Sequence, residues 1–117
     1  MVVDDSSTIR TGITRSLEHR GYAVIEASDG IEALALLERN SIDLMVTDLN
    51  MPNLDGIGLT EQARKLKGYR FLPIILLTSE DKNEFHDMAK KMGVSAWLSK
   101  PFEQNKLAKI VDMLTSM

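Results

Sequence analysis

The sequence of 117 residues contains no cysteine, which excludes disulfide bonds, thiolate metal sites and thiol nucleophiles and fits a reducing cytoplasm. It has no excess of positive charge either. A formal net charge of -3 gives no broad positive field, so we expect no nucleic-acid binding by this domain. Long apolar runs are also missing, since the longest, Phe71 to Leu77, is interrupted by Pro73 and is too short to cross a bilayer. We therefore expect a cytoplasmic protein that does not bind membranes.

What remains is the composition of an ordinary globular domain, with 44% hydrophobic and 26% charged residues. The chain shows no internal repeat, no low-complexity tract and no linker long enough to separate two domains. Residues 1–117 are therefore expected to form one domain.

Short β-rich runs alternate with segments of helical periodicity along the whole chain. This alternation favours an α/β fold in which parallel strands are joined by right-handed helical crossovers. Doubly wound, flavodoxin-like domains of this size commonly have five strands in the order 2-1-3-4-5, and we expect that order here by analogy. The expected strands are Val2 to Val3, Tyr22 to Ile25, Leu44 to Val46, Ile74 to Leu77, and Ala96 to Leu98.

Five apolar stripes with helical spacing lie between and after these runs and predict five amphipathic helices. Asp29 and Glu32 have the spacing of a capping box, while Gly21 and Gly93 stand where helices should end. The stripes are Ile9, Ile13 and Leu17; Ile31, Leu34 and Ala35; Leu59, Ala63 and Leu66; Phe85, Met88, Ala89 and Met92; and Leu107, Ile110, Val111 and Leu114.

Polar residues follow four of the predicted strands. Asp4 and Asp5 follow the first strand, Asp48 the third, Thr78 the fourth and Lys100 the fifth. Ligands of open parallel sheets bind outside the carboxyl ends of the strands, and in the order 2-1-3-4-5 these strand ends are close neighbours. We therefore expect three carboxylates and one ammonium group around one rim of the sheet.

Three clustered carboxylates repel one another, and a hard cation with oxygen ligands relieves that repulsion. Mg²⁺ suits such a site because it accepts few protein ligands and leaves coordination positions for phosphate oxygens. A carboxylate such as Asp48 can then act as a nucleophile toward a phosphoryl group, with charge supplied by Lys100 and a hydrogen bond by Thr78. Taken singly, Asp4 and Asp5 could simply cap a helix.

These residues belong to four motifs that together span essentially the whole chain. The motifs resemble those of receiver domains of bacterial two-component response regulators, especially the single-domain chemotaxis type. They are VVDDSST at residues 2–8, TDLNMPNLDG at 47–56, LTSE at 77–80 and SKPF at 99–102.

The resemblance implies that Asp48 accepts a phosphoryl group from a histidine kinase and that Lys100 contacts that group. It also implies that Mg²⁺, or Mn²⁺ as the alternative, is bound by the carboxylates of Asp4, Asp5 and Asp48 and by the backbone carbonyl of Asn50.

The resemblance further implies a switching mechanism. Thr78 would move toward the phosphoryl group, Trp97 would act as a rotamer switch, and Asn50 and Glu80 would tune the lifetime of the phosphoaspartate. Lys100-Pro101 would be a cis peptide bond. Trp97 is bulkier than the Tyr or Phe more often found at its position, and the first strand is shorter than receivers usually have.

The implied function is a switch that promotes only its own phosphorylation and dephosphorylation and is not otherwise an enzyme. Its phosphorylated form would change its affinity for a target protein or phosphatase that binds near the fourth and fifth helices. Chemotaxis signalling is favoured because no output domain follows Met117.

Other functions stay open at this point. The chain could be a receiver excised from a larger regulator, or a receiver that binds partners without phosphorylation. A haloacid-dehalogenase-like phosphatase would need an acid two residues after Asp48, where Asn50 stands. A flavodoxin-like cofactor binder could use Ser6 to Thr8 as a phosphate loop, but Asp4 and Asp5 would repel the phosphate.

Overall fold

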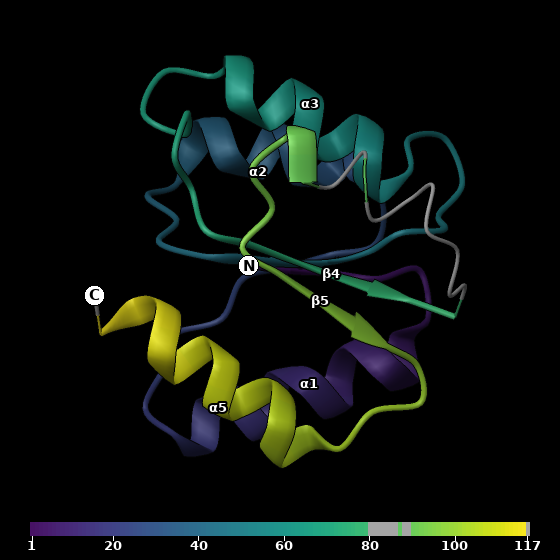
Figure 1. The fold of residues 1–117 in the computed structure, drawn as a ribbon, viewed down its shortest axis with the longest axis vertical. Helices are drawn as coiled ribbons and strands as arrows, with labels where there is room; N and C mark the ends of the chain where they lie inside the picture. The colour runs from purple at the N-terminus through teal and green to yellow at the C-terminus, as the bar shows by residue number, and fades with distance from the viewer. Residues whose placement is uncertain (80–86, 88–89, 117) are drawn as a thin grey trace.

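The computed structural model of the protein describes residues 1–79, 87 and 90–116. It contains a five-stranded parallel sheet in the order β2-β1-β3-β4-β5 with helices on both faces (Figure 1). This confirms the predicted fold class and strand order. The strands are β1 (Val2–Val3), β2 (Glu26–Ala27), β3 (Met45–Asp48), β4 (Ile74–Thr78) and β5 (Ala96–Ser99).

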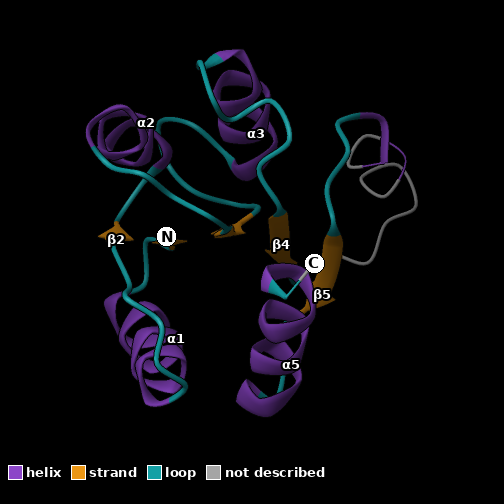
Figure 2. Cartoon of the chain, turned by 90° about the vertical axis from the view of Figure 1, so that its left-hand side faces the viewer, coloured by secondary structure: helices purple, strands orange, loops and turns teal. Residues whose placement is uncertain are grey.

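Helices cover both faces of the sheet. Figure 2 shows α1 and α5 on one face and α2 and α3 on the other. Among the described residues the helices are α1 (Ser7–His19), α2 (Gly30–Arg39), α3 (Gly56–Lys65) and α5 (Gln104–Thr115). The helix expected from Phe85 to Met92 lies mostly outside these residues. None of the described helices is both long and apolar enough to cross a membrane.

Three helices begin at a side-chain cap close to the carboxyl edge of the sheet. Ser6 accepts a hydrogen bond from the backbone N–H of Ile9, Asp29 from that of Glu32, and Asp55 from that of Gly58. Such caps satisfy backbone donors that a helix leaves unpaired in its first turn. Each cap therefore fixes the residue at which the preceding loop ends and the helix begins.

The inner strands β3 and β4 are buried along their whole length, which explains their largely apolar sequence. Met45 and Ile74 contribute to the core under α2 and α3. Val46 and Ile75 contribute to the second core, under α1 and α5. Because β3 is held between two cores, its last residue, Asp48, has a fixed position at the edge of the sheet.

The second strand lies further along the chain than the sequence predicts. The expected run ends at Ile25, whereas β2 consists of Glu26 and Ala27, which pair with Val2 and Val3 of β1. The carbonyl of Ile25 accepts one hydrogen bond from Val2. Apolar residues before it pack against the core under α1 and α5 without joining the ladder. An apolar run indicates which residues are buried, but pairing with the neighbouring strand determines which residues form the hydrogen-bonded ladder.

The apolar stripe predicted for α2 is only partly right, because Leu34 packs against the core under α2 and α3 but the other two residues of the stripe do not. Ile31 is 56% exposed and Ala35 is exposed, whereas Ala33 and Leu37 are buried. Together with the buried Gly30, these two residues follow the helical spacing of the face that packs on the sheet. Small residues at this contact let the helix approach closely, which a search for large apolar side chains overlooks.

Arg64, in the last turn of α3, binds backbone atoms of two loops. Its guanidinium group donates hydrogen bonds to the carbonyls of Tyr69 and Leu72, before β4, and to those of Met92 and Gly93, before β5. Burial lowers the pKa of Arg64. We call this set of contacts the Arg64 clamp.

Candidate functional site

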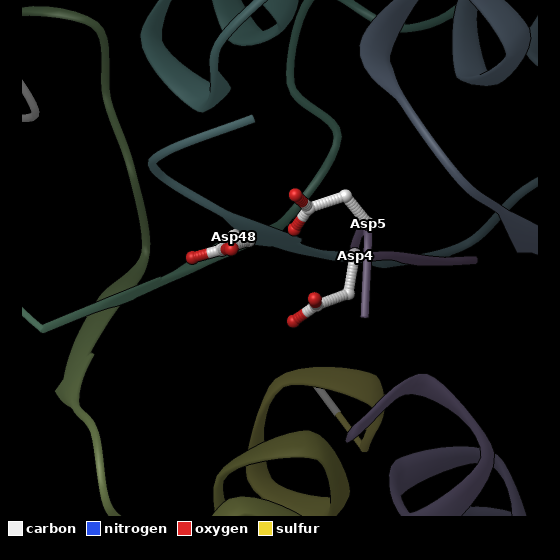
Figure 3. A group of neighbouring side chains, drawn as sticks. All are labelled: Asp4, Asp5 and Asp48. Carbon is white, nitrogen blue, oxygen red and sulfur yellow. The ribbon is translucent and has the colours of Figure 1, made fainter. Parts of the chain in front are cut away.

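The predicted acidic residues meet at the carboxyl edge of the sheet. Asp4 and Asp5 directly follow β1, and Asp48 is the last residue of the neighbouring β3. One carboxylate oxygen from each of the three lies within 4.8 Å of the others (Figure 3). Asp4 is 1% and Asp48 7% exposed, while Asp5 is open to solvent. We call these three residues the acidic cluster.

Lys100, which follows β5, places its ammonium group between two members of the cluster. The Lys100 Nζ atom lies 3.1 Å from Asp4 Oδ2 and 3.2 Å from Asp48 Oδ1. The other oxygen of Asp4 accepts a hydrogen bond from the backbone N–H of Ser6. One ammonium group faces three carboxylates, so the site keeps an excess of negative charge.

The charge imbalance shifts two pKa values. Burial raises the pKa of Asp48, and repulsion from Asp4 and Asp5 adds to the effect, while Lys100 opposes it. Burial alone would lower the pKa of Lys100, but its hydrogen bonds and attraction to Asp4 and Asp48 outweigh burial, so its pKa is raised. Lys100 therefore stays positively charged at neutral pH, and the charged form of Asp48 is disfavoured until further positive charge arrives.

The donor set suits a hard divalent cation. Its ligand atoms are carboxylate oxygens, which Mg²⁺ prefers, and the negative excess is of the sign that a cation removes. Asp5 also lines a shallow pocket of about 380 Å³ with Asn50, Met51, Pro52 and Asp55. Of the acidic cluster, Asp5 lines this pocket and is exposed, so an ion can approach the cluster from this side.

Thr78 and Trp97, the two predicted switch residues, lie on neighbouring strands. Thr78 is the last residue of β4 and is fully buried, and its carbonyl accepts a hydrogen bond from the backbone N–H of Lys100. Trp97, on β5, is half-buried and packs against a small core that contains Leu49 and Leu76. Leu49 directly follows Asp48, so the small core against which Trp97 packs includes the residue next to the acidic cluster in the chain.

The remaining predicted residues differ in what the structure says of them. Asn50 is exposed in the loop after β3, and Glu80 lies outside the described residues. The Lys100-Pro101 peptide bond is cis, as the resemblance implies.

Gly56, the first residue of α3, is a site residue that the sequence reasoning missed. A Cβ atom at this position would lie 2.4 Å from the carbonyl oxygen of Asp48, closer than any real contact. The backbone N–H of Gly56 also donates a hydrogen bond to the carbonyl of Leu49. The signal in the sequence is the Asp55-Gly56 pair just before an apolar helix, where only glycine allows α3 to begin against the end of β3.

Comparisons with known proteins agree with this geometry. A family model described as the response regulator receiver domain matches residues 1–112. A chemotaxis protein CheY homolog of Campylobacter jejuni is 39% identical, covering 97% of this chain and 90% of its own length. The alkaline phosphatase synthesis transcriptional regulatory protein PhoP of Bacillus subtilis is 38% identical over 92% of this chain but only 44% of its own length. Among solved structures, Vibrio cholerae chemotaxis protein CheY4 superposes with a TM-score of 0.92 at 36% identity, over 97% of this chain and 94% of that one.

Proposed function

Because the chain belongs to the response regulator receiver domain family, we propose that it is a phosphorylation-dependent signalling switch whose phosphoacceptor is Asp48. One observation carries the proposal: the buried carboxylate of Asp48 lies beside both the ammonium group of Lys100 and the carboxylates of Asp4 and Asp5. A nucleophile, a fixed positive charge and a set of oxygen ligands therefore meet at one edge of the sheet.

We assign the cation site to Asp4, Asp5 and Asp48, with the backbone carbonyl of Asn50 as a further ligand. Mg²⁺ is the proposed ion, and Mn²⁺ is the alternative. A bound ion would neutralise charge on the phosphoryl oxygens. The carboxylate oxygens of the acidic cluster and their negative excess support this assignment.

In the transfer step an oxygen of Asp48 attacks the phosphorus atom of a phosphohistidine on the kinase. An O–P bond forms while the N–P bond breaks, and the imidazole leaves with the bonding electron pair and takes up a proton. Lys100, already 3.2 Å from Asp48, then pairs with an oxygen of the phosphoryl group. Hydrolysis of the acyl phosphate, by this domain or with a phosphatase, returns Asp48 to its free form.

The proposed output is a change in binding, not in catalysis of another reaction. Thr78 is placed one strand from Asp48, and Trp97 contacts the core that contains Leu49. A shift of Thr78 toward the phosphoryl group and a turn of Trp97 would therefore alter the surface near β5 and α5. A target protein that prefers this altered form binds the phosphorylated domain more tightly and, by linkage, favours phosphorylation.

Similarity to chemotaxis proteins along nearly their whole length favours a chemotaxis-type pathway in the cytoplasm. Residues 1–117 would then be one receiver domain. The match to less than half of a transcriptional regulator supports the second candidate, a receiver that works as part of a larger regulator. Both candidates require the same chemistry at Asp48.

The test is the intact mass of the protein after incubation with a small-molecule acyl phosphate donor. We expect a gain of one phosphoryl group that needs Mg²⁺ and is absent in Asp48→Asn. Asp55→Asn is the matched control, because Asp55 lines the pocket next to the acidic cluster together with Asp5 but caps α3, and this variant should still gain the group. A folded wild-type protein that gains no mass with any donor would contradict the proposal.

A further inference from the structure

The loop between β3 and α3, residues 49–55, is anchored by a helix that does not contribute to the acidic cluster. Leu54 lies between Gly30, the first residue of α2, and Gly58, in the first turn of α3. Figure 2 shows these two helices on the same face of the sheet. Asn50 lies at the other end of this loop, so the contacts that hold the loop also affect the position of Asn50 at the site.

The two glycines contact different parts of Leu54. A Cβ atom on Gly30 would lie 2.8 Å from the backbone oxygen of Leu54 and 2.9 Å from its Cβ. A Cβ atom on Gly58 would instead lie 2.6 Å from Cδ1, at the far end of the Leu54 side chain. The first conflict cannot be relieved by a rotamer change, because the backbone of the loop itself stands in the way. The second can.

A second contact joins the loop to the same turn of α2. Asp29 caps α2 with one carboxylate oxygen, and its other oxygen accepts a hydrogen bond from the side-chain amide of Asn53 at 3.3 Å. Asn53 has a backbone φ of 72°, a conformation that non-glycine residues seldom adopt. One side chain therefore fixes both the start of α2 and a strained position of the loop.

We propose that Asp29 and Gly30 are positioning residues for the cation site. They hold the loop so that Asn50 faces the pocket it shares with Asp5, although neither residue belongs to the acidic cluster. The role of the loop in cation binding rests on the proposed function, whereas the anchoring of the loop rests on the contacts alone.

The test compares glycine variants by their Mg²⁺ affinity, measured by isothermal titration calorimetry, and by their free energy of unfolding in urea. Gly30→Ala should displace the loop backbone and weaken Mg²⁺ binding roughly tenfold, the scale seen when a residue that orients metal ligands is lost. Gly58→Ala should leave the affinity within about twofold, because only the end of the Leu54 side chain must move. Gly12→Ala is the matched control, since a Cβ atom there meets only Gln104 Nε2 at 3.5 Å.

Amide chemical shifts separate this inference from the proposed function. In Gly30→Ala, the amides of residues 49–55 should shift more than in Gly58→Ala, with or without Mg²⁺. If the wild-type protein binds no Mg²⁺, the cation site fails while these shifts still report whether Gly30 places the loop. A folded Gly30→Ala protein with wild-type affinity and unchanged loop amides would overturn the inference.

A variant that adds no atoms covers the case in which Gly30→Ala does not fold. Asn53→Gly keeps the positive φ accessible and removes only the amide that binds Asp29. We expect weaker Mg²⁺ binding and shifted loop amides. Wild-type values for both measurements would show that the contact with Asp29 does not position the loop.

Discussion

Two clusters of charged residues, one at each end of the molecule, use similar groups to different effect. The acidic cluster and Lys100 lie at the carboxyl edge of the sheet. The other cluster joins the turn after α1 to the end of α5: Arg20 lies 2.5 Å from one oxygen of Asp112, and the Tyr22 hydroxyl donates to the other at 2.6 Å. We call this second group the Asp112 cluster.

The difference lies in charge balance and exposure. In the Asp112 cluster one carboxylate faces one guanidinium group, and the side chains of Arg20 and Asp112 are 35% and 42% exposed. Water screens such a pair, which then serves as a weak tether between two elements. At the carboxyl edge, by contrast, the carboxylates of Asp4 and Asp48 are buried and the charges do not balance. A binding site is therefore distinguished by its uncompensated charge, not by its number of charged residues.

Removing the ammonium group of Lys100 should have the largest effect on stability. In Lys100→Ala without metal, Asp4 and Asp48 lose their cation while still buried, and we expect a loss of about 3 kcal/mol in the free energy of unfolding. Mg²⁺ should stabilise this variant more than the wild type, because it meets a larger negative excess. Urea unfolding with EDTA or Mg²⁺ measures both. Lys109→Ala, at an exposed position of α5, is the control, and an equal loss there would contradict the prediction.

Removing one negative charge should have the opposite sign and a smaller size. In EDTA at pH 7, Asp48→Asn should gain on the order of 1 kcal/mol, because the charged form of Asp48 is disfavoured in the folded state. The raised pKa of Asp48 means that the wild type pays this cost above that pKa and regains stability as the pH falls through it. The advantage of the variant should therefore shrink in acid.

Urea unfolding of both proteins between pH 7 and pH 4 checks this prediction. A stability difference that stays constant over the range, or a variant less stable than wild type at pH 7 without metal, would show that Asp48 is not under electrostatic strain.

Breaking the Asp112 cluster should have the smallest effect. Asp112→Asn should cost less than about 1 kcal/mol and leave Mg²⁺ affinity unchanged. The hydrogen bond to Asp112 raises the pKa of Tyr22, so the variant should lower that pKa toward its ordinary value. Ultraviolet absorbance of tyrosinate during a pH titration measures the change, with Tyr22→Phe identifying the signal. A loss of Mg²⁺ binding in Asp112→Asn would contradict the contrast between the clusters.

The sequence predicts the sheet and the meeting of Asp4, Asp5, Asp48 and Lys100 because both follow from strand ends. Buried parallel strands are recognisable in the sequence as continuous apolar runs, and the residues that follow them lie at the same edge of the sheet. What the sequence does not reveal depends on pairs of distant residues. The position of β2 is set by its ladder with β1.

Contacts made by small residues are harder still to predict. Ile31 is the largest apolar residue near the start of α2 and suggests the buried face, yet Gly30 and Ala33 occupy that face. No pattern in the sequence predicts the close contact of Gly30 with Leu54, because a glycine at the start of a helix indicates only where the helix begins. Roles of Thr78 and Trp97 stay predictions, since they concern a change between two states of the domain.

The Arg64 clamp has a consequence for how the sequence can evolve. Its four hydrogen bonds end on backbone carbonyls, which every amino acid provides. Substitutions at positions 69, 72, 92 and 93 therefore keep the carbonyl groups that accept the hydrogen bonds of the Arg64 clamp. Position 64 has no such freedom, because a lysine offers its donors from a single nitrogen and cannot reach carbonyls of two separate loops at once. The contacts that join α3 to the loops before β4 and β5 thus constrain the amino acid at one position, Arg64.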